Sequence, residues 1–329
     1  MKLRTMFLWT LAAAASLLTS GCISNSKTIS EKPATIERIV YHGWKDSIRL
    51  HSKEAEVIVV PEIGRVMSFR FRDGENVFWE DRSLDGKRGD AGGKEWINFG
   101  GDKTWPAPEA EWGKYTGHKE WMPPPAFDSL PVAATVTNQE VVLISPVDPH
   151  YGVRTIRHVQ LWGSSLRIDT TYERVSGEPS KIGIWVITQF KDPVAIYGFR
   201  EQKSIFADGH FKFSDEPWPQ LRIKDDHFEI TRDLKSPHKM GSDTDRLVWV
   251  GQRETCIVSS ERMKGAEYPD RGASAEVYTN PDPKKYIEIE MLGPLSLMKP
   301  GDTISRFSTY VLRERREKNP ATELLSLGW

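Results

Sequence analysis

Alternation of hydrophobic and polar positions predicts β-strands along most of this chain. In the segment 166–175, Leu166 and Tyr172 share one face, while charged side chains occupy the opposite face. This two-residue period is typical of a strand with one buried face. The segment 182–190 is apolar on both faces and predicts a central strand. Since no stretch before Pro320 has a strong helical period, we expect an all-β fold in which two antiparallel sheets stack on each other.

The other expected strands are separated by turn signals. In the segment 65–72, the alternation predicts that Met67, Phe69 and Phe71 face one way. One short helical turn is expected at 321–327. We expect the remaining strands at 57–60, 76–79, 132–136, 141–145, 153–162, 247–250, 256–260, 275–279, 286–292 and 304–313, with shorter ones near Phe211, Leu221 and Phe228.

The region 80–131 interrupts this pattern and is longer than a connection without a function usually is. Within it, the stretch Asn98–Trp112 has neither a helical nor a strand period. Two glycines free its backbone and two prolines fix it, so it predicts a rigid loop. The region also holds four of the chain's twelve tryptophans, which favours a binding loop over a linker.

Two interpretations fit the Asn98–Trp112 stretch. In the first, its tryptophans cap the core of a sandwich. In the second, an indole ring stacks on a sugar while nearby charged groups bind the sugar hydroxyls. The second interpretation predicts that Trp105 faces a cleft, while Phe99 and Trp112 hold the loop to the core.

The N-terminus predicts export and lipid anchoring. A basic start is followed by an apolar run, 6–18, that is too short to span a membrane. The sequence Leu-Thr-Ser-Gly-Cys at 18–22 then resembles the lipobox of bacterial lipoproteins. This resemblance implies cleavage before Cys22 and acylation of that residue, which would anchor the protein to a membrane of the cell envelope, outside the cytoplasm. An ordinary secretory signal cut nearby is the alternative.

Composition agrees with this location and excludes several functions. With 45 basic and 46 acidic residues, the chain offers no electrostatic basis for binding nucleic acid. Its cysteines are Cys22 and Cys256, so no disulfide framework or cysteine zinc site is expected. Cys256 reads as a small core residue. We find no motif for a cofactor, for a metal or for phosphate binding.

Three segments carry a family resemblance. Val60–Phe69 looks like the opening hairpin of galactose mutarotase-like (aldose 1-epimerase-like) proteins, and 287–302 looks like their closing strands with a Pro-Gly turn. With the Gly-Gly-Asp-Lys-Thr-Trp-Pro-Ala-Pro-Glu stretch at 100–109, the chain resembles bacterial lipoproteins of domain of unknown function 4380. The resemblance implies a large β-supersandwich that binds carbohydrate across a concave sheet face. Its expected boundaries are 1–21 for the signal peptide, 22–36 for the tether, 37–316 for the sandwich and 317–329 for a tail.

The predicted strand at 286–292 offers a binding face. A two-residue period places Tyr286, Glu288 and Glu290 on one side and the apolar residues on the core side. These three side chains form either a sugar platform or an ordinary solvated strand face. Lys239 is either a contact to a sugar or carboxylate or an exposed loop lysine. The full set of expected substrate-binding residues is Arg65, Asp102, Lys103, Trp105, Glu109, Lys239 and Glu288.

The resemblance also implies a candidate catalytic activity. Mutarotation needs a base that removes the proton of the anomeric hydroxyl and an acid that protonates the ring oxygen. In true mutarotases a glutamate near the closing strands is the base, and Glu290 is the best positional match. The candidate acids are His150, in a turn, and His158, on the predicted strand 153–162. Neither histidine lies in a mutarotase-like motif, and without an acid the protein would be a binder.

The sequence therefore predicts a lipid-anchored envelope protein that binds a mono- or oligosaccharide in a mutarotase-like cleft. Two other functions remain open at this point. One is an active aldose mutarotase or epimerase with Glu290 as general base. The other is a surface lipoprotein without catalysis that binds a protein or an envelope polymer. The last would be favoured if the loop tryptophans were buried and no polar cleft existed.

Overall fold

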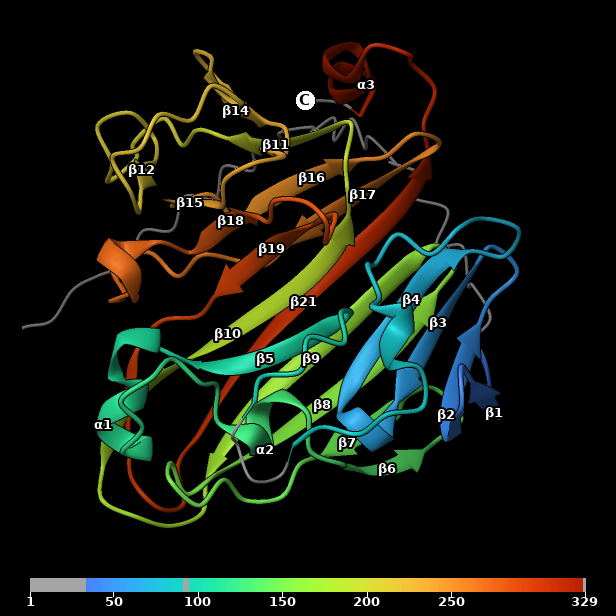
Figure 1. Cartoon of the computed structure of the whole chain (residues 1–329), viewed down its shortest axis with the longest axis vertical. Coiled ribbons are helices and arrows are strands. Elements are labelled where there is room, and N and C mark those ends of the chain that lie inside the picture. Colours follow the sequence, from blue (N-terminus) through green and yellow to red (C-terminus); the bar gives the residue numbers. More distant parts are fainter. Residues whose placement is uncertain (1–33, 91–94, 328–329) are drawn as a thin grey trace, which may run out of the picture. The chain divides into compact units, whose positions relative to one another are not determined.

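Two antiparallel β-sheets face each other in the computed structural model, which describes residues 34–90 and 95–327 (Figure 1). The prediction of an all-β sandwich is confirmed. Three short helices accompany the sheets: α1 (Trp112–Thr116), α2 (Pro125–Asp128) and α3 (Pro320–Ser326). Single 3-10 turns lie at Pro61–Ile63, Arg82–Leu84, Glu109–Glu111 and Asp270–Gly272.

One sheet has eleven strands within the described residues. Its spatial order is β1 (Thr35–Tyr41), β2 (Trp44–His51), β3 (Ala55–Val60), β4 (Arg65–Phe71), β5 (Asp102–Ala107), β10 (Ser180–Lys191), β19 (Tyr286–Leu292), β18 (Ala275–Thr279), β15 (His238–Ser242) and β12 (Phe211–Lys212), with β20 (Ser296–Met298) paired to one end of β10.

The other sheet has ten strands within the same residues. Its order is β13 (Leu221–Ile223), β14 (His227–Ile230), β11 (Ala195–Phe199), β16 (Arg246–Val250), β17 (Glu254–Ser259), β21 (Thr303–Glu314), β9 (Ser165–Arg174), β8 (Val153–Trp162), β7 (Val141–Ile144) and β6 (Ala133–Val136).

The main hydrophobic core fills the space between the two sheets. Ile287 and Ile289 of β19 belong to one buried cluster with Ile168 of β9 and Leu312 of β21. Their neighbours along each strand point to the opposite sides of the sandwich, as the pleat requires. The eleven-stranded sheet therefore has an inner face against this core and a second face, which we call the outer face.

The largest difference from the expected elements lies in the Asn98–Trp112 stretch. Asp102–Ala107 is not a loop but the strand β5, which pairs with β10 over six residue pairs. Proline is unusual inside a sheet because it has no backbone N–H to donate to a neighbouring strand. The presence of Pro106 is therefore why the sequence did not predict a strand here. Only the flanks of the stretch are irregular. The consequence is that its side chains alternate between the inner and outer faces.

The strand at 65–72 also departs from strict alternation. The β3–β4 ladder shifts register between Ile58 and Val59, which leaves Met67 as an extra residue on β4. As a result, Met67 packs in a separate buried cluster with Trp44 and Phe99, while Phe69 lies in the main core. The expectation that Met67 and Phe69 share a face is wrong, because a bulge reverses the pattern.

Sequence reasoning missed the strands β1, β11, β15 and β20, and it placed a strand at 76–79 where the structure has only an isolated bridge. The first strand begins at Thr35, inside the segment expected to be a tether. In the expected tail, Leu324 of α3 packs against Tyr197 and Val248. The predicted signal peptide and the lipidation of Cys22 lie outside the described residues and stay predictions.

No helix among the described residues is both long enough and apolar enough to cross a membrane. Cys256 lies fully buried in the main core, as expected for a small core residue. Burial raises the pKa of its thiol above the usual value. This thiol is therefore inert at neutral pH.

Candidate functional site

The outer face of the eleven-stranded sheet carries its charged and aromatic side chains in rows set by strand register. Trp105 of β5 pairs with Trp185 of β10. In the next row, Ile187 pairs with Glu290 of β19, and Glu290 pairs with Glu276 of β18. Residues paired across antiparallel strands point to the same side. The expected grouping of Tyr286, Glu288 and Glu290 opposite an apolar face agrees with this geometry.

Lys239 of β15 lies at the centre of this arrangement. Its Nζ is 2.8 Å from an Oε atom of Glu276 and 3.0 Å from one of Glu290. The same ammonium lies 4.7 Å from the ring centre of Trp185, which donates its indole N–H to Glu290 at 2.8 Å. Burial alone would lower the pKa of Lys239, but the two carboxylates outweigh it and raise that pKa well above its usual value.

The two glutamates are under-satisfied. Glu276 and Glu290 are each 1% exposed. Beyond the oxygens that face Lys239, the other carboxyl oxygen of Glu276 and of Glu290 is buried and accepts no hydrogen bond from the described residues. Burial raises the pKa of Glu276 well above its usual value, against the opposing effect of Lys239. Burial therefore favours the protonated form of Glu276 relative to an exposed glutamate.

A second lysine, Lys103 of β5, lies deeper in the same face. It is fully buried, and its Nζ lies 3.7 Å from Glu288 and 4.5 Å from the ring centre of Trp105. Burial lowers the pKa of Lys103 to about 8. Glu288 in turn accepts a hydrogen bond from Gln189 at 2.7 Å, and burial raises its pKa. The pKa of Lys103 thus lies close to neutral pH, so its ammonium group begins to lose its proton just above that pH.

The side chain of Trp105 is buried and fixed by a hydrogen bond. It is 3% exposed, and its indole N–H donates to Asp128 of α2 at 3.0 Å. Asp128 also pairs with the fully buried Arg65 at 2.7 Å. The prediction that Trp105 stacks on a ligand therefore needs correction, because Trp96, Trp112, Trp121 and Trp185 surround its ring at centroid distances of 5.2–6.1 Å. Arg65 likewise has no exposed surface for a ligand.

A cavity of about 530 Å³ opens next to this cluster. Lys239 lies on its lining, together with Trp112 and the 48% exposed Trp121. Glu109 and Asp270 also line it, and Glu109 accepts a hydrogen bond from the Trp121 indole. This cavity is where a ligand can approach the Lys239 group. The remaining lining residues are Ala110, Gly113, His118, Lys119, Glu120, Met122 and Phe213.

Asp102 does not belong to the site. It precedes Lys103 on β5, so its side chain points to the inner face, where it is fully buried. There it binds Arg157 of β8 and accepts hydrogen bonds from Thr188 and Tyr310, both at 2.7 Å. The expectation that Asp102 binds a sugar hydroxyl is therefore corrected: it links the two sheets instead.

Neither candidate histidine is brought to Glu290. His158 lies on the far side of the ten-stranded sheet, where it contacts Glu140 at 3.0 Å. His150 is exposed in the turn before β8, and its ring lies 6.4 Å from that of His118. The expected role of these two histidines as the acid partner of Glu290 is corrected by this placement. Any acid partner for Glu290 must be one of the groups on the outer face.

Sequence reasoning missed Glu276, Trp185, Asp128 and Asp270. Glu276 and Trp185 lie on strands that were expected, and the same two-residue period used for Glu290 could have assigned their faces. Asp128 and Asp270 lie outside the strands, and only the folded chain brings them near Trp105 and Lys239.

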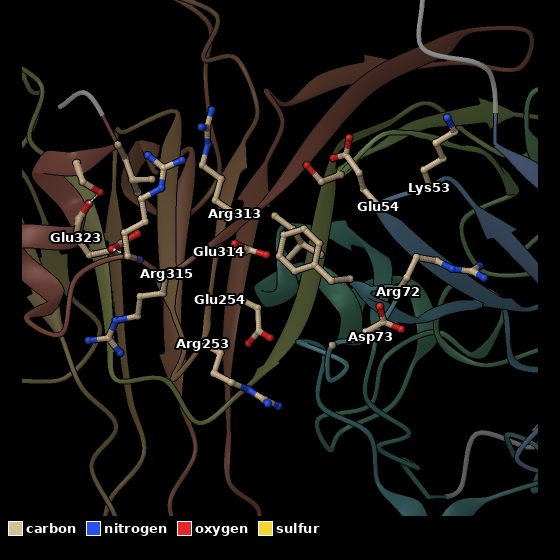
Figure 2. A pocket seen from close by; sticks show the side chains of 17 residues that line it. Lys53, Glu54, Arg72, Asp73, Arg253, Glu254, Arg313, Glu314, Arg315 and Glu323 are labelled. Carbon is tan, nitrogen blue, oxygen red and sulfur yellow. Dashed lines mark hydrogen bonds between the residues drawn. The ribbon is translucent and has the colours of Figure 1, made fainter.

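A larger cavity, of about 730 Å³, lies elsewhere, near the end of β21 (Figure 2). The guanidinium groups of Arg72, Arg253 and Arg313 point in different directions there instead of converging. One carboxyl oxygen of the buried Glu323 accepts the backbone N–H groups of Arg316 and Glu317, and its other oxygen has no hydrogen-bond partner among the described residues. This cavity therefore lacks a set of side chains organised around a common point.

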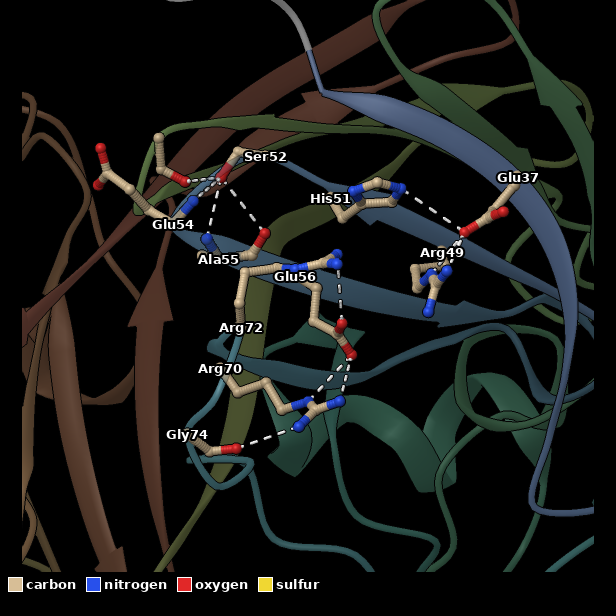
Figure 3. A network of polar contacts seen from close by, with 11 residues as sticks. Glu37, Arg49, His51, Ser52, Glu54, Ala55, Glu56, Arg70, Arg72 and Gly74 are labelled. Carbon is tan, nitrogen blue, oxygen red and sulfur yellow. Dashed lines mark hydrogen bonds and ion pairs between the residues drawn. The ribbon is translucent and has the colours of Figure 1, made fainter.

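The outer face near β1 to β4 carries ordinary cross-strand ion pairs (Figure 3). Glu56 pairs with Arg70 at 2.7 Å, and Glu37 contacts Arg49 and His51. The groups around Glu37 are partly exposed, so their ion pairs contribute little stability, whereas Glu56 is buried and held by Arg70 and Arg72. Among the described residues, no group of three or more His, Cys, Asp or Glu is placed to hold a metal ion.

Comparison with solved structures identifies the fold. The chain superposes on a galactose mutarotase-like protein from Lactobacillus casei with a TM-score of 0.56 and 8% identity, over 81% of this chain and 100% of that one. A galactose mutarotase related enzyme from Lactobacillus acidophilus gives a TM-score of 0.53 and 10% identity, over 81% and 97%. The fold is thus galactose mutarotase-like, as expected.

A TPR-domain containing protein from Parabacteroides distasonis also matches, with a TM-score of 0.54 and 13% identity. The match covers 81% of this chain but only 46% of that longer protein. No protein-family model and no curated protein matches the sequence. The resemblance to domain of unknown function 4380 therefore stays a prediction.

Proposed function

We propose that this protein binds carbohydrate in the cavity beside Lys239. One observation carries the proposal: Lys239 lines a cavity with aromatic walls, and one carboxyl oxygen each of Glu276 and Glu290, the two glutamates that bind Lys239, lacks a hydrogen-bond donor among the described residues. Sugar hydroxyls are donors, and the apolar faces of sugar rings pack on indole rings. The mutarotase-like fold supports the same ligand class, because its neighbours include enzymes related to galactose mutarotase.

Within this proposal, Trp121 replaces Trp105 as the stacking residue. Trp121 is 48% exposed and lines the cavity, whereas Trp105 is covered by other tryptophans. Lys239, Glu109 and Asp270 surround the sugar hydroxyls, and Glu290 holds Lys239 in place.

The alternative of a surface lipoprotein that binds a protein or polymer would be favoured by two features together, buried loop tryptophans and no polar cleft. Trp105 and Trp112 are buried, but the cavity beside Lys239 is a polar cleft, so only the first feature is present.

We predict that Trp121→Ala weakens binding about tenfold, because loss of one aromatic stacking partner removes roughly 1–1.5 kcal/mol. A glycan array would identify ligands of the wild type, and calorimetric titration would give both dissociation constants. The matched control is Trp162→Ala, on the outward side of the ten-stranded sheet. If the wild type is folded and binds no glycan at all, the proposal is wrong.

Catalysis of the 1-epimerase type is a second candidate, favoured by the pairing of two glutamates, Glu276 and Glu290, around Lys239. The two residues face each other across β18 and β19. Burial raises the pKa of Glu276, while Glu290 accepts hydrogen bonds from Lys239 and from the Trp185 N–H. One carboxyl group would then protonate the ring oxygen while the other removes the anomeric proton.

We predict that the wild type accelerates the change in optical rotation of a freshly dissolved aldose, and that Glu290→Gln slows it at least a hundredfold. General base catalysis typically contributes a factor of about 100 to 10,000, which sets this expectation. Polarimetry against a buffer blank measures the rate. A wild-type rate equal to the blank for every aldose that binds would leave binding as the sole function.

A further inference from the structure

Two of the residues that line the cavity beside Lys239 are aromatic and have large exposed surfaces. Trp121 is 48% exposed and Phe213 is 42% exposed. Exposed apolar surface that polar residues border is typical of a ligand-binding groove. Because both residues face solvent with nearly half of their surface, the cavity does not enclose a small ligand on all sides. The affinity of a ligand therefore depends on how many of its parts contact an aromatic ring.

Trp121 is held in a fixed position by its neighbours. Its ring packs against those of Trp96, Trp105 and Trp112 at centroid distances of 5.2–5.9 Å. Its indole N–H also donates a hydrogen bond to Glu109. An aromatic ring that is already ordered loses little conformational entropy when a ligand stacks on it. Trp121 is therefore a preformed platform for a sugar ring.

Phe213 is a second platform, and the sheet holds it in place. Its backbone N–H donates to the carbonyl oxygen of Lys239 at 3.0 Å, which extends the pairing of β12 with β15. Its ring centre lies 4.9 Å from that of Phe211 and 5.1 Å from Nζ of Lys239. Phe213 is thus ordered next to the lysine on which the proposed site is centred.

The two platforms are anchored on different strands of the eleven-stranded sheet. Trp121 packs on Trp105 of β5, whereas Phe213 follows β12, beside β15. Three strands separate β5 from β15, and four strand spacings of about 4.8 Å place these two strands roughly 19 Å apart. In Figure 1, α1, which precedes Trp121, is well separated from β12. A single sugar ring is about as wide as one aromatic ring, so it cannot stack on both platforms.

We infer that the ligand of this cavity is an oligosaccharide of at least two rings, one stacked on Trp121 and another on Phe213. The inference rests on the proposed carbohydrate function and narrows it from sugars in general to oligosaccharides. Lys239 has three N–H donors, of which two are directed at Glu276 and Glu290, so one remains for a hydroxyl of the ligand. The cavity volume of about 530 Å³ is also typical of pockets for ligands larger than a monosaccharide.

Titration calorimetry on the full-length chain would compare the mono-, di- and trisaccharide of three series, the oligomers of cellulose, galactan and chitin. In a series that binds, we expect the longer sugars to bind at least tenfold more tightly than the monosaccharide, because a second stacking contact is worth about a factor of ten. Every glycan that binds on the array would be titrated against its own terminal monosaccharide in the same way.

Longer sugars that bind no more tightly than their monosaccharide would overturn the oligosaccharide inference and leave carbohydrate binding intact. Absence of binding by every glycan would overturn the proposed function as well.

Phe213→Ala should lower the affinity for the trisaccharide about tenfold and leave the affinity for the monosaccharide nearly unchanged, because a single ring stacks on Trp121 alone. Phe213→Tyr keeps the aromatic ring and should keep both affinities. Ile223→Ala, at a 38% exposed position on β13 of the other sheet, is the control and should change neither. An equal loss for both sugars in Phe213→Ala would contradict the inference, because Phe213 would then act only through its contact with Lys239.

Discussion

Arg157→Met should lower the free energy of unfolding by about 3–5 kcal/mol, because it leaves a buried carboxylate without its cation. Arg157 is 3% exposed and its partner Asp102 is fully buried. Two hydroxyl donors, Thr188 and Tyr310, would still reach Asp102. These neutral donors stabilise a carboxylate less than a guanidinium does, so most of the loss should remain.

Urea unfolding followed by tryptophan fluorescence would measure this loss. The matched control lies three residues earlier on the same strand, where Arg154 pairs with Glu173 at 2.7 Å on the outward face. That pair is more than 30% exposed on each side, so Arg154→Met should change stability by less than about 1 kcal/mol. Equal effects of the two substitutions would show that the pair between Arg157 and Asp102 does not link the sheets energetically.

Adding Asp102→Asn to Arg157→Met should recover part of the lost stability. The neutral amide removes the buried charge and can still accept a hydrogen bond from Tyr310. A double variant less stable than Arg157→Met alone would mean that packing around Arg157, and not the unpaired charge, sets the loss.

The sequence specified the sandwich well because its strands follow a simple rule. Segments such as 153–162, 275–279 and 286–292 match the observed strands to the residue, since one face of each is buried against the same core. Alternation of this kind is local information. It therefore also assigned Glu288 and Glu290 to the outer face before any fold was known.

The candidate site was predicted only in part, because its contacts depend on pairing between distant strands. Lys103 and Asp102 are adjacent in sequence, yet one faces the site and the other faces the core. Once Pro106 concealed the strand β5, no local rule could separate these two residues. Similarly, Glu276 joins Glu290 only through the β18–β19 register, and Lys239 only through β15.

The tryptophans also show what the sequence alone could not predict. Their enrichment between 80 and 131 correctly indicated a special region, but enrichment does not say which ring is exposed. In the folded chain Trp105 and Trp112 are buried, and Trp121 takes the exposed position at the cavity. Exposure depends on how α1 and the chain after it fold over β5, which composition does not encode.

The second large effect is expected for Lys239→Met. The substitution removes the ammonium group that lies between Glu276 and Glu290 and leaves two buried carboxyl groups facing each other. Loss of one partner from a buried charged group typically destabilises by about 3–5 kcal/mol. We expect a loss of this size at pH 7, together with loss of sugar binding.

The loss should depend on pH with a defined sign. Without Lys239, burial and the nearby Glu290 hold the pKa of Glu276 above the usual 4.5. Between pH 4.5 and that raised value, the folded variant binds more protons than the unfolded chain, so its stability falls as the pH rises. Near pH 4.5 the folded carboxyl group is protonated and the unfolded one is about half protonated, so the difference from the wild type should shrink by at least half.

Unfolding free energies of wild type and Lys239→Met at pH 4.5 and pH 7.5 would test this sign. Lys181→Met is the control, because Lys181 pairs with Glu267 on the surface, with both side chains more than 45% exposed. Its effect should stay below about 1 kcal/mol at both pH values. A Lys239→Met deficit that is as large at pH 4.5 as at pH 7.5 would mean that lost packing against Trp185 and Phe213, and not charge, is what Lys239 contributes. Because the proposed ligand site depends on that charge, such a result would also remove the electrostatic basis for ligand binding at this cavity.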